Sequence, residues 1–150
     1  MTVNKKPLPK DLSDWHDYLR AFRLPANPRV KIAALQKLKA PTGNAKNVAA
    51  ILQEDPALSL MLMREANKSL HHNDNETRSL SHTLSLLGFP YVETLLRRVE
   101  DYEPESFPYY SQYQQEISVS LHAAYQMQAW AEHNPFWPKD EIFWCAVFQR

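Results

Sequence analysis

Apolar residues recur at intervals of three and four along nearly the whole chain, which is the spacing of one buried face of an α-helix. Alternating, strand-like patterns are sparse. The clearest one, at Ile117, Val119 and Leu121, lies inside a longer stretch, residues 109–133, that also fits a helix. The pattern therefore predicts an all-α protein of about seven or eight helices.

Residues that commonly begin and end helices support this prediction. The dipeptides Asn27-Pro28 and Asp55-Pro56 each suit an N-cap followed by a first-turn proline, because proline has no backbone N–H to leave unpaired there. Gly88 is expected to end a later helix, since glycine accepts a positive φ without strain. The inward-facing side chains predicted for the helix after Asn27 are Ile32, Leu35 and Leu38.

Aromatic residues are distributed unevenly along the chain. Five precede residue 100 and twelve follow it, and an acidic, proline-containing segment, 100–108, separates the two parts. This distribution predicts two lobes. The last helix is expected to run from Pro138 to Arg150, where its apolar pattern is still incomplete, so the chain is interpreted as the front part of a longer one.

Four aromatic residues are the candidates for contact with a partner: Tyr109, Tyr110, Phe136 and Trp137. Rigid aromatic side chains are enriched at interaction surfaces, because they bury a large area at small entropic cost. The alternative explanation is that these residues pack between the two lobes. Their exposure in the folded protein distinguishes the two interpretations.

Composition excludes several classes of function. The chain has only two glycines, so it cannot carry the glycine-rich loops of common nucleotide sites. Its 17 basic and 17 acidic residues give a net charge of zero, which argues against nucleic-acid binding by phosphate neutralisation, since such domains are usually basic. The longest apolar run, 142–148, is too short to span a membrane or to form a signal peptide. These features predict a cytoplasmic protein.

Three ordered segments resemble a known family. Residues 53–58 read Gln-Glu-Asp-Pro-Ala-Leu, and residues 61–67 continue with Met-Leu-Met-Arg-Glu-Ala-Asn. Residues 79–88 read Ser-Leu-Ser-His-Thr-Leu-Ser-Leu-Leu-Gly, and Leu24-Pro25 lies upstream. Together they resemble the HDOD domain of bacterial signalling proteins. The resemblance implies a multi-helical, two-lobe HDOD-like domain over 24–150, truncated at its C-terminus, and leaves 1–23 as an N-terminal helical extension.

The HDOD family is related to HD-type metal phosphohydrolases, which bind metal through histidine and aspartate. The resemblance places Val119, Gln149 and Arg150 where such ligands would stand. Valine has no lone pair, glutamine is a poor ligand for a catalytic transition metal, and arginine adds a positive charge. The resemblance thus implies no enzymatic activity, no metal and no cofactor. A degenerate metal-dependent phosphohydrolase of nucleotides or cyclic dinucleotides remains the alternative.

Other candidate groups have simpler explanations. His16-Asp17 lies in an amphipathic helix, and His71-His72 lies in a polar loop where adjacent side chains usually point apart. The remaining histidines in helical patterns, His82, His122 and His133, are isolated from one another. Cys145 stands in an apolar run, which predicts a buried and unreactive thiol.

Residues 48–67 have the spacing of a helix-turn-helix, so a DNA-binding regulator is a third hypothesis. The second helix of this pair offers Arg64 and Asn67, but its leucine and methionine stripe is better explained as core. The leading prediction is a non-catalytic signal-transduction module that binds either a protein partner of a bacterial signalling pathway or a small regulatory ligand.

Overall fold

The structure is a computed structural model, and it describes residues 10–21, 26–69, 77, 79–101 and 109–149, with the side chains of 17–21 and 69 excepted. Within these residues the chain forms eight helices, and its extended pairing is limited to one isolated bridge between Ala26 and Asp101. The helices are α1 (Leu12–Ala21), α2 (Pro28–Lys39), α3 (Ala45–Leu52), α4 (Pro56–Ser69), α5 (Leu80–Leu87), α6 (Phe89–Arg98), α7 (Tyr110–Ala131) and α8 (Lys139–Val147). The predicted all-α fold is confirmed, including a helix rather than a strand at 117–121.

The predicted helix ends follow from local hydrogen bonds. The side-chain oxygen of Asn27 accepts a hydrogen bond from the backbone N–H of Arg29 at 3.0 Å, and Pro28 occupies the first helical position of α2. Gly88 has a φ of 75° and separates α5 from α6. Because both features depend only on residues a few positions apart, they could be predicted from sequence.

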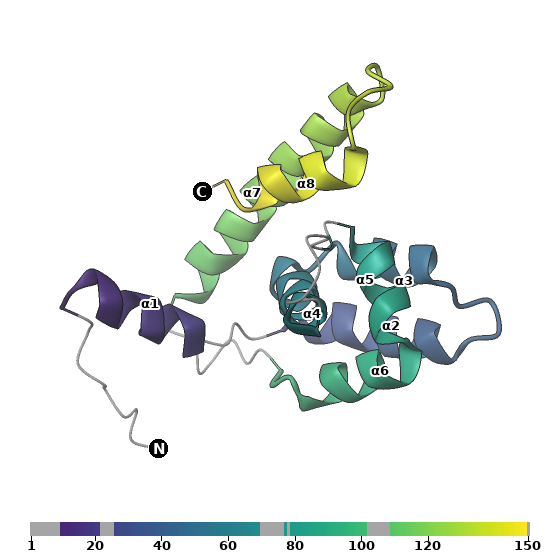
Figure 1. The fold of residues 1–150 in the computed structure, drawn as a ribbon, viewed down its shortest axis with the longest axis horizontal. Helices are drawn as coiled ribbons and strands as arrows, with labels where there is room; N and C mark the ends of the chain where they lie inside the picture. The colour runs from purple at the N-terminus through teal and green to yellow at the C-terminus, as the bar shows by residue number, and fades with distance from the viewer. Residues whose placement is uncertain (1–9, 22–25, 70–76, 78, 102–108, 150) are drawn as a thin grey trace.

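Helices α2 to α6 pack on one another and form one unit, the five-helix lobe (Figure 1). Its core is almost entirely aliphatic: Val30, Ala34, Leu38, Val48, Leu52, Leu58, Leu62, Leu80, Leu84, Val92 and Leu96 are all buried. The prediction for Ile32 was wrong, because its side chain is 53% exposed. The face of α2 that meets α3 and α6 is the one carrying Val30, Ala34 and Leu38.

The two ends of the five-helix lobe are tied together by a buried cation. The Nζ of Lys31, in α2, donates a hydrogen bond to the backbone carbonyl of Val99 at 3.0 Å and forms an ion pair with Asp101. The Lys31 residue is only 8% exposed, so the charge needs these partners. They fix the end of α6 against α2, at the point where the chain leaves the lobe.

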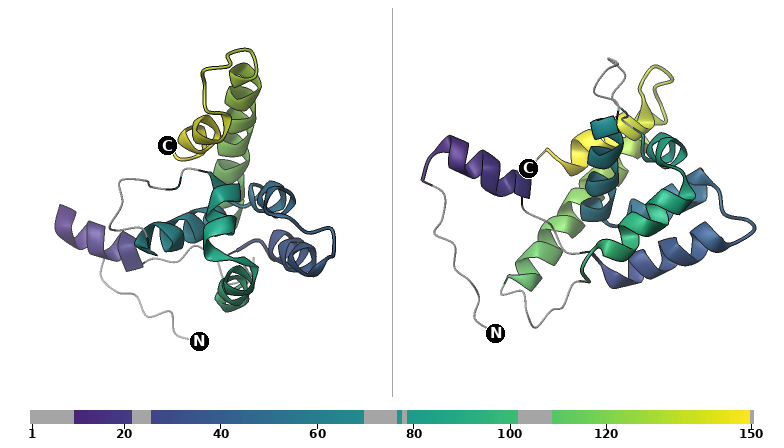
Figure 2. Two further views of the ribbon diagram at one scale, coloured as in Figure 1. Left: turned by 45° about the vertical axis from the view of Figure 1, so that its right-hand side comes forward. Right: turned by 60° about the horizontal axis from the view of Figure 1, so that its bottom comes forward.

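Helices α7 and α8 form an antiparallel hairpin that stands out from the five-helix lobe (Figure 1), and Figure 2 shows the same hairpin from two further directions. This is the second lobe expected from the sequence. The last helix ends at Val147 and not at Arg150, since Phe148 already has a non-helical backbone. In the described part of the chain, no helix is both long and apolar enough to cross a membrane.

Candidate functional site

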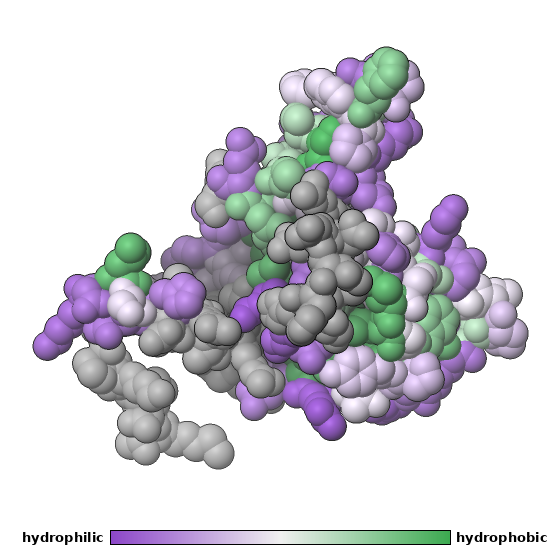
Figure 3. Space-filling view, viewed as in Figure 1, coloured by the Kyte–Doolittle hydropathy of each residue, from purple (hydrophilic) through white to green (hydrophobic). Residues whose placement is uncertain are grey.

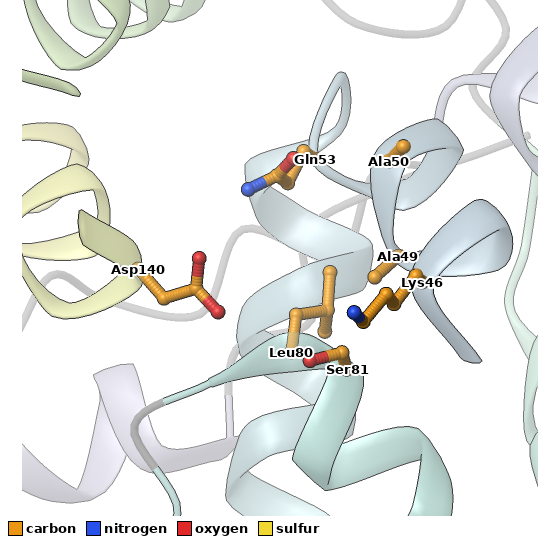
Figure 4. A pocket seen from close by; sticks show the side chains of 7 residues that line it. All are labelled: Lys46, Ala49, Ala50, Gln53, Leu80, Ser81 and Asp140. Carbon is orange, nitrogen blue, oxygen red and sulfur yellow. The ribbon is translucent and has the colours of Figure 1, made fainter. Parts of the chain in front are cut away.

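A cleft of about 200 Å³ lies where the hairpin meets the five-helix lobe (Figure 4). Its walls come from the α3 region, from the first turn of α5 and from the first turn of α8. The lining residues are Lys46, Ala49, Ala50, Gln53, Leu80, Ser81 and Asp140. This is the place where residues far apart in the sequence bring charged, polar and apolar groups around one space.

A hydrogen bond joins the two lobes beside this cleft. The hydroxyl of Ser79, just before α5, donates to Asp140 Oδ2 at 2.8 Å. Ser79 has a single hydroxyl hydrogen, so the 2.9 Å contact between Ser79 Oγ and Ser81 Oγ must have Ser81 as its donor. The three side chains therefore form a short chain of hydrogen bonds that ends on the carboxylate of α8.

Ser79 is held in place by buried threonines. The hydroxyl groups of Thr77 and Thr83 lie 3.2 Å apart, and both contact the backbone carbonyl of Ser79, at 3.2 and 3.0 Å. The backbone N–H of Thr77 donates to the side-chain oxygen of Asn67 at 3.0 Å. Asn67, the last residue of the 61–67 motif, thus fixes the entry to α5 and through it the position of Ser79.

Asp55 connects three parts of the five-helix lobe. Its carboxylate accepts hydrogen bonds from the backbone N–H groups of Asn27 (2.7 Å), Ala57 (2.9 Å) and Leu58 (3.1 Å), so it caps α4 and also holds the start of α2. Burial raises the pKa of Asp55 above its ordinary value, and the three backbone N–H groups oppose this rise. The residue has a structural role in the lobe.

The second helix of the predicted helix-turn-helix, α4, turns two of its leucines into the core. Leu58 and Leu62 of α4 are buried in the core, and Asn67 accepts the internal hydrogen bond from Thr77. Arg64 is exposed. The leucine stripe of α4 is therefore core, as the alternative explanation expected.

The four aromatic residues predicted to contact a partner lie at two separate places. Tyr109 and Tyr110 are at the start of α7, whereas Phe136 and Trp137 follow its other end. A helix of 22 residues is about 33 Å long, so the two pairs cannot form one compact surface. Their exposed fractions range from 37% for Tyr110 to 90% for Phe136. Tyr109 and Phe136 are therefore mostly exposed, whereas Tyr110 and Trp137 are more than half covered.

A third aromatic residue joins one of these pairs. Trp130, in the last turn of α7, is 65% exposed. Backbone hydrogen bonds from His133 to Trp130 and from Trp137 to Asn134 fold the chain tightly between α7 and α8. We call Trp130, Phe136 and Trp137 the hairpin tip, and Figure 3 shows a small hydrophobic area among more hydrophilic residues at this end of the molecule. Sequence reasoning missed Trp130, although its helix is unusual in carrying only one charged residue, Glu116.

The positions that correspond to metal ligands lie on the hairpin. Val119 is in the middle of α7 and 38% exposed, and Gln149 is exposed just beyond α8. Arg150 lies outside the described residues, as do His71 and His72. In the part that the structure describes, no three His, Cys, Asp or Glu side chains lie close enough together to hold a metal ion.

The isolated histidines and the cysteine are at the surface. His16, His82, His122 and His133 are all exposed, and His122 Nε2 contacts Gln126 within α7 at 3.0 Å. The side chain of Asp17 lies outside the described residues. The prediction of a buried Cys145 was wrong: the thiol is exposed, because α8 turns Phe143, Trp144, Ala146 and Val147 inward and leaves Cys145 on its outer face.

The comparison with protein families decides the classification. The HDOD domain model matches residues 24–149. The chain belongs to the HDOD family. In this HDOD domain, the motif residues Asp55, Asn67 and Ser79 all make the internal hydrogen bonds described above. The bond of Ser79 is the one that reaches the hairpin, at Asp140.

Solved structures share the fold of this HDOD domain. A crystal structure of the MmoQ response regulator from Methylococcus capsulatus str. Bath aligns with a TM-score of 0.67 at 23% identity, covering 85% of this chain and 52% of that one. A crystal structure of a fragment of the same regulator gives a TM-score of 0.63 at 24% identity, with coverage of 83% and 48%. The chain spans about half the length of these structures. No curated protein matches it in sequence.

Proposed function

We propose that this HDOD domain is a non-catalytic signalling module that binds a protein partner through the hairpin tip. The observation that carries the proposal is the exposure of three large aromatic side chains at one end of the hairpin: Trp130 at 65%, Phe136 at 90% and Trp137 at 45%. All three lie within eight residues of one another at the hairpin turn, and none belongs to the core cluster.

The helix that leads to the tip is poor in charge, whereas exposed Glu132 and Lys139 flank the tip itself. Helix α7 carries one charged residue in 22, whereas the exposed face of a helix in contact with water usually carries several. Protein interfaces are depleted in charge and enriched in aromatic residues at their centres. Full burial of one such side chain contributes roughly 1.5–3 kcal/mol. Two or three of them would support a specific, reversible contact.

The residues at the positions of HD-type metal ligands support the absence of catalysis. Val119 offers no donor atom, and Gln149 and Arg150 are chemically unsuited to replace a histidine and an aspartate. The absence of catalysis is tested by a hydrolysis assay of the purified chain with nucleotides and cyclic dinucleotides, with and without Mn²⁺ and Mg²⁺. Metal-dependent turnover that copurifies with the chain would contradict a non-catalytic role.

Partner binding is tested by affinity capture from the source cells, followed by mass spectrometry. The bait carrying Phe136→Ala and Trp137→Ala is expected to lose a protein that the unchanged bait retains. Ile32→Ala is the matched control, because Ile32 is also a large exposed apolar residue (53%) but lies on α2 of the other lobe. Circular dichroism confirms that each bait is folded. If the double variant and the control retain the same proteins, the hairpin tip is not the binding surface.

A further inference from the structure

The cleft between the lobes carries opposite charges on its two sides. Lys46 belongs to α3 of the five-helix lobe and Asp140 to the first turn of α8 in the hairpin. Figure 4 shows the ammonium group of Lys46 and the carboxylate of Asp140 both directed into the space between them. A molecule that occupies this space therefore meets a positive group on one lobe and a negative group on the other.

Both charged groups have polar atoms that can still bind a ligand. Among the residues that the structure describes, Lys46 has no ion pair or side-chain hydrogen bond, whereas Lys31, Lys39 and Lys68 each pair with a carboxylate. Asp140 receives the Ser79 hydroxyl on Oδ2, which leaves Oδ1 able to accept further hydrogen bonds.

The remaining walls of the cleft define the rest of the ligand. Leu80 lies between the two charged groups in Figure 4, and Ala49 lies beside Lys46. Ala50 adds further apolar lining, and Ser81 and Gln53 add a hydroxyl and an amide. The volume is about 200 Å³, below the roughly 300–1,000 Å³ of sites for drug-sized ligands. It accommodates a molecule of about the size of an amino acid.

We propose that this cleft binds a small zwitterion of the amino-acid type. Its carboxylate would pair with Lys46, its ammonium group would donate to Asp140 Oδ1, and its short apolar part would lie on Ala49 and Leu80. A phosphate ester fits less well, because Asp140 repels a second negative group. A divalent cation fits less well, because Lys46 repels it.

The position of the cleft gives such a ligand a regulatory effect. It would bridge the two lobes, which share the Ser79–Asp140 hydrogen bond at this point. A ligand that binds one arrangement of the lobes more tightly than another shifts the population toward that arrangement. The hairpin tip lies on the same hairpin, so a ligand that selects one position of the hairpin would also act on the tip, an effect that rests on the proposed partner-binding function.

The test is isothermal titration of the whole 150-residue chain with the standard L-amino acids, each probed separately. At least one is expected to bind saturably, with affinity reduced about tenfold or more in Lys46→Gln and in Asp140→Asn. Lys139→Gln is the matched control, since it removes the same charge from the residue next to Asp140, outside the cleft, and should change affinity less than twofold. Asparagine keeps an oxygen for Ser79, so Asp140→Asn is expected to remain folded.

Two derivatives of the bound amino acid test the zwitterion directly. The N-acetyl form lacks the ammonium group and the amide form lacks the carboxylate, so both are expected to lose binding. Absence of binding by every amino acid overturns the proposal, as does binding that is unchanged in both cleft variants or fully retained by either derivative. The Phe136→Ala, Trp137→Ala double variant should bind the zwitterion normally. This result separates the cleft from the partner surface, so either proposal can fail alone.

Discussion

The five-helix lobe and the α7–α8 hairpin are built from the same kind of helix but bury different kinds of side chain. The five-helix lobe has a closed aliphatic core in which Leu52, Leu62, Leu84 and Leu96 are fully buried. The hairpin relies on aromatic rings: Phe143 contacts Tyr125 and Trp144 edge to face, with ring centroids 5.3 and 5.0 Å apart. A third pair, Trp144 and Phe148, is stacked at 5.6 Å.

The two parts also differ in how their buried polar groups are paired. Polar groups inside the five-helix lobe, such as Asp55, Ser59 and Thr83, all have hydrogen-bond partners. In the hairpin, the buried indole N–H of Trp144 has none in the described structure. The hairpin also exposes the aromatic residues of its tip. In the function proposed above, the five-helix lobe is the scaffold and the hairpin tip is the interaction surface.

The largest effect is expected from Phe143→Ala. Phe143 is fully buried and belongs to the cluster that joins the hairpin to the five-helix lobe, so the variant should lower the free energy of unfolding by about 3–5 kcal/mol. Urea unfolding followed by circular dichroism measures the change. Trp130→Ala, an exposed aromatic residue of the same hairpin, should cost less than about 0.5 kcal/mol. Equal effects of the two substitutions would contradict the assignment of Phe143 to the core.

Asp55→Ala should have the next largest effect, in the five-helix lobe. It leaves the N–H groups of Asn27, Ala57 and Leu58 without their acceptor, which costs about 2–3 kcal/mol through the lost cap and the unpaired buried donors. The same urea titration measures it. Ser85→Ala is a suitable control in this lobe, because its exposed hydroxyl bonds only to the preceding turn of α5.

The pH dependence of Asp55 has a defined sign. Burial raises the pKa of Asp55 in the folded protein, so protonation of this group favours the folded state. This proton-linked part of its contribution to stability is fully present below the ordinary pKa and is lost as the pH rises through the folded value. The unfolding free energy of the wild type, relative to Asp55→Asn, should therefore fall over this range. Glu65 should behave oppositely, because hydrogen bonds from Lys68 and Tyr91 lower its pKa. A rise for Asp55 over the same range would show that the three N–H groups outweigh burial.

Ser79→Ala is expected to weaken the contact between the two parts by about 1 kcal/mol, the usual net value of one hydrogen bond. Hydrogen exchange should become faster in α8 while the buried helices of the five-helix lobe keep their protection. Ser111→Ala, at an exposed hydroxyl near the start of α7, provides the control. Unchanged exchange in α8 would mean that the apolar contacts alone hold the hairpin in place.

The smallest effect should come from Trp144→Phe, which is expected to change stability by less than about 1 kcal/mol. The substitution removes some buried area, but it also removes an N–H group that has no acceptor, and the two contributions have opposite signs. Thermal unfolding measures the result. A loss as large as that of Phe143→Ala would indicate that the indole N–H has a partner in solution.

The local features of this chain were determined by the sequence. Asn27-Pro28 and Asp55-Pro56 begin helices and Gly88 ends one, because capping and a positive φ depend on atoms within about four residues of each other. The helical period and the ordered motifs also identified the all-α fold and the family. These features needed no knowledge of which helices are neighbours in space.

Only the tertiary structure decided which side chains face inward and which distant residues meet. Ile32 and Cys145 lie in apolar stretches and yet are exposed, since the neighbours of α2 and α8 cover other faces of these helices. The packing of the helices places Lys46 and Asp140 on the same cleft. It also brings Ser79 within hydrogen-bond distance of Asp140, although the two residues are 61 positions apart in the sequence. Such contacts depend on how whole helices pack, because the free energy of burial is shared among many side chains from several helices.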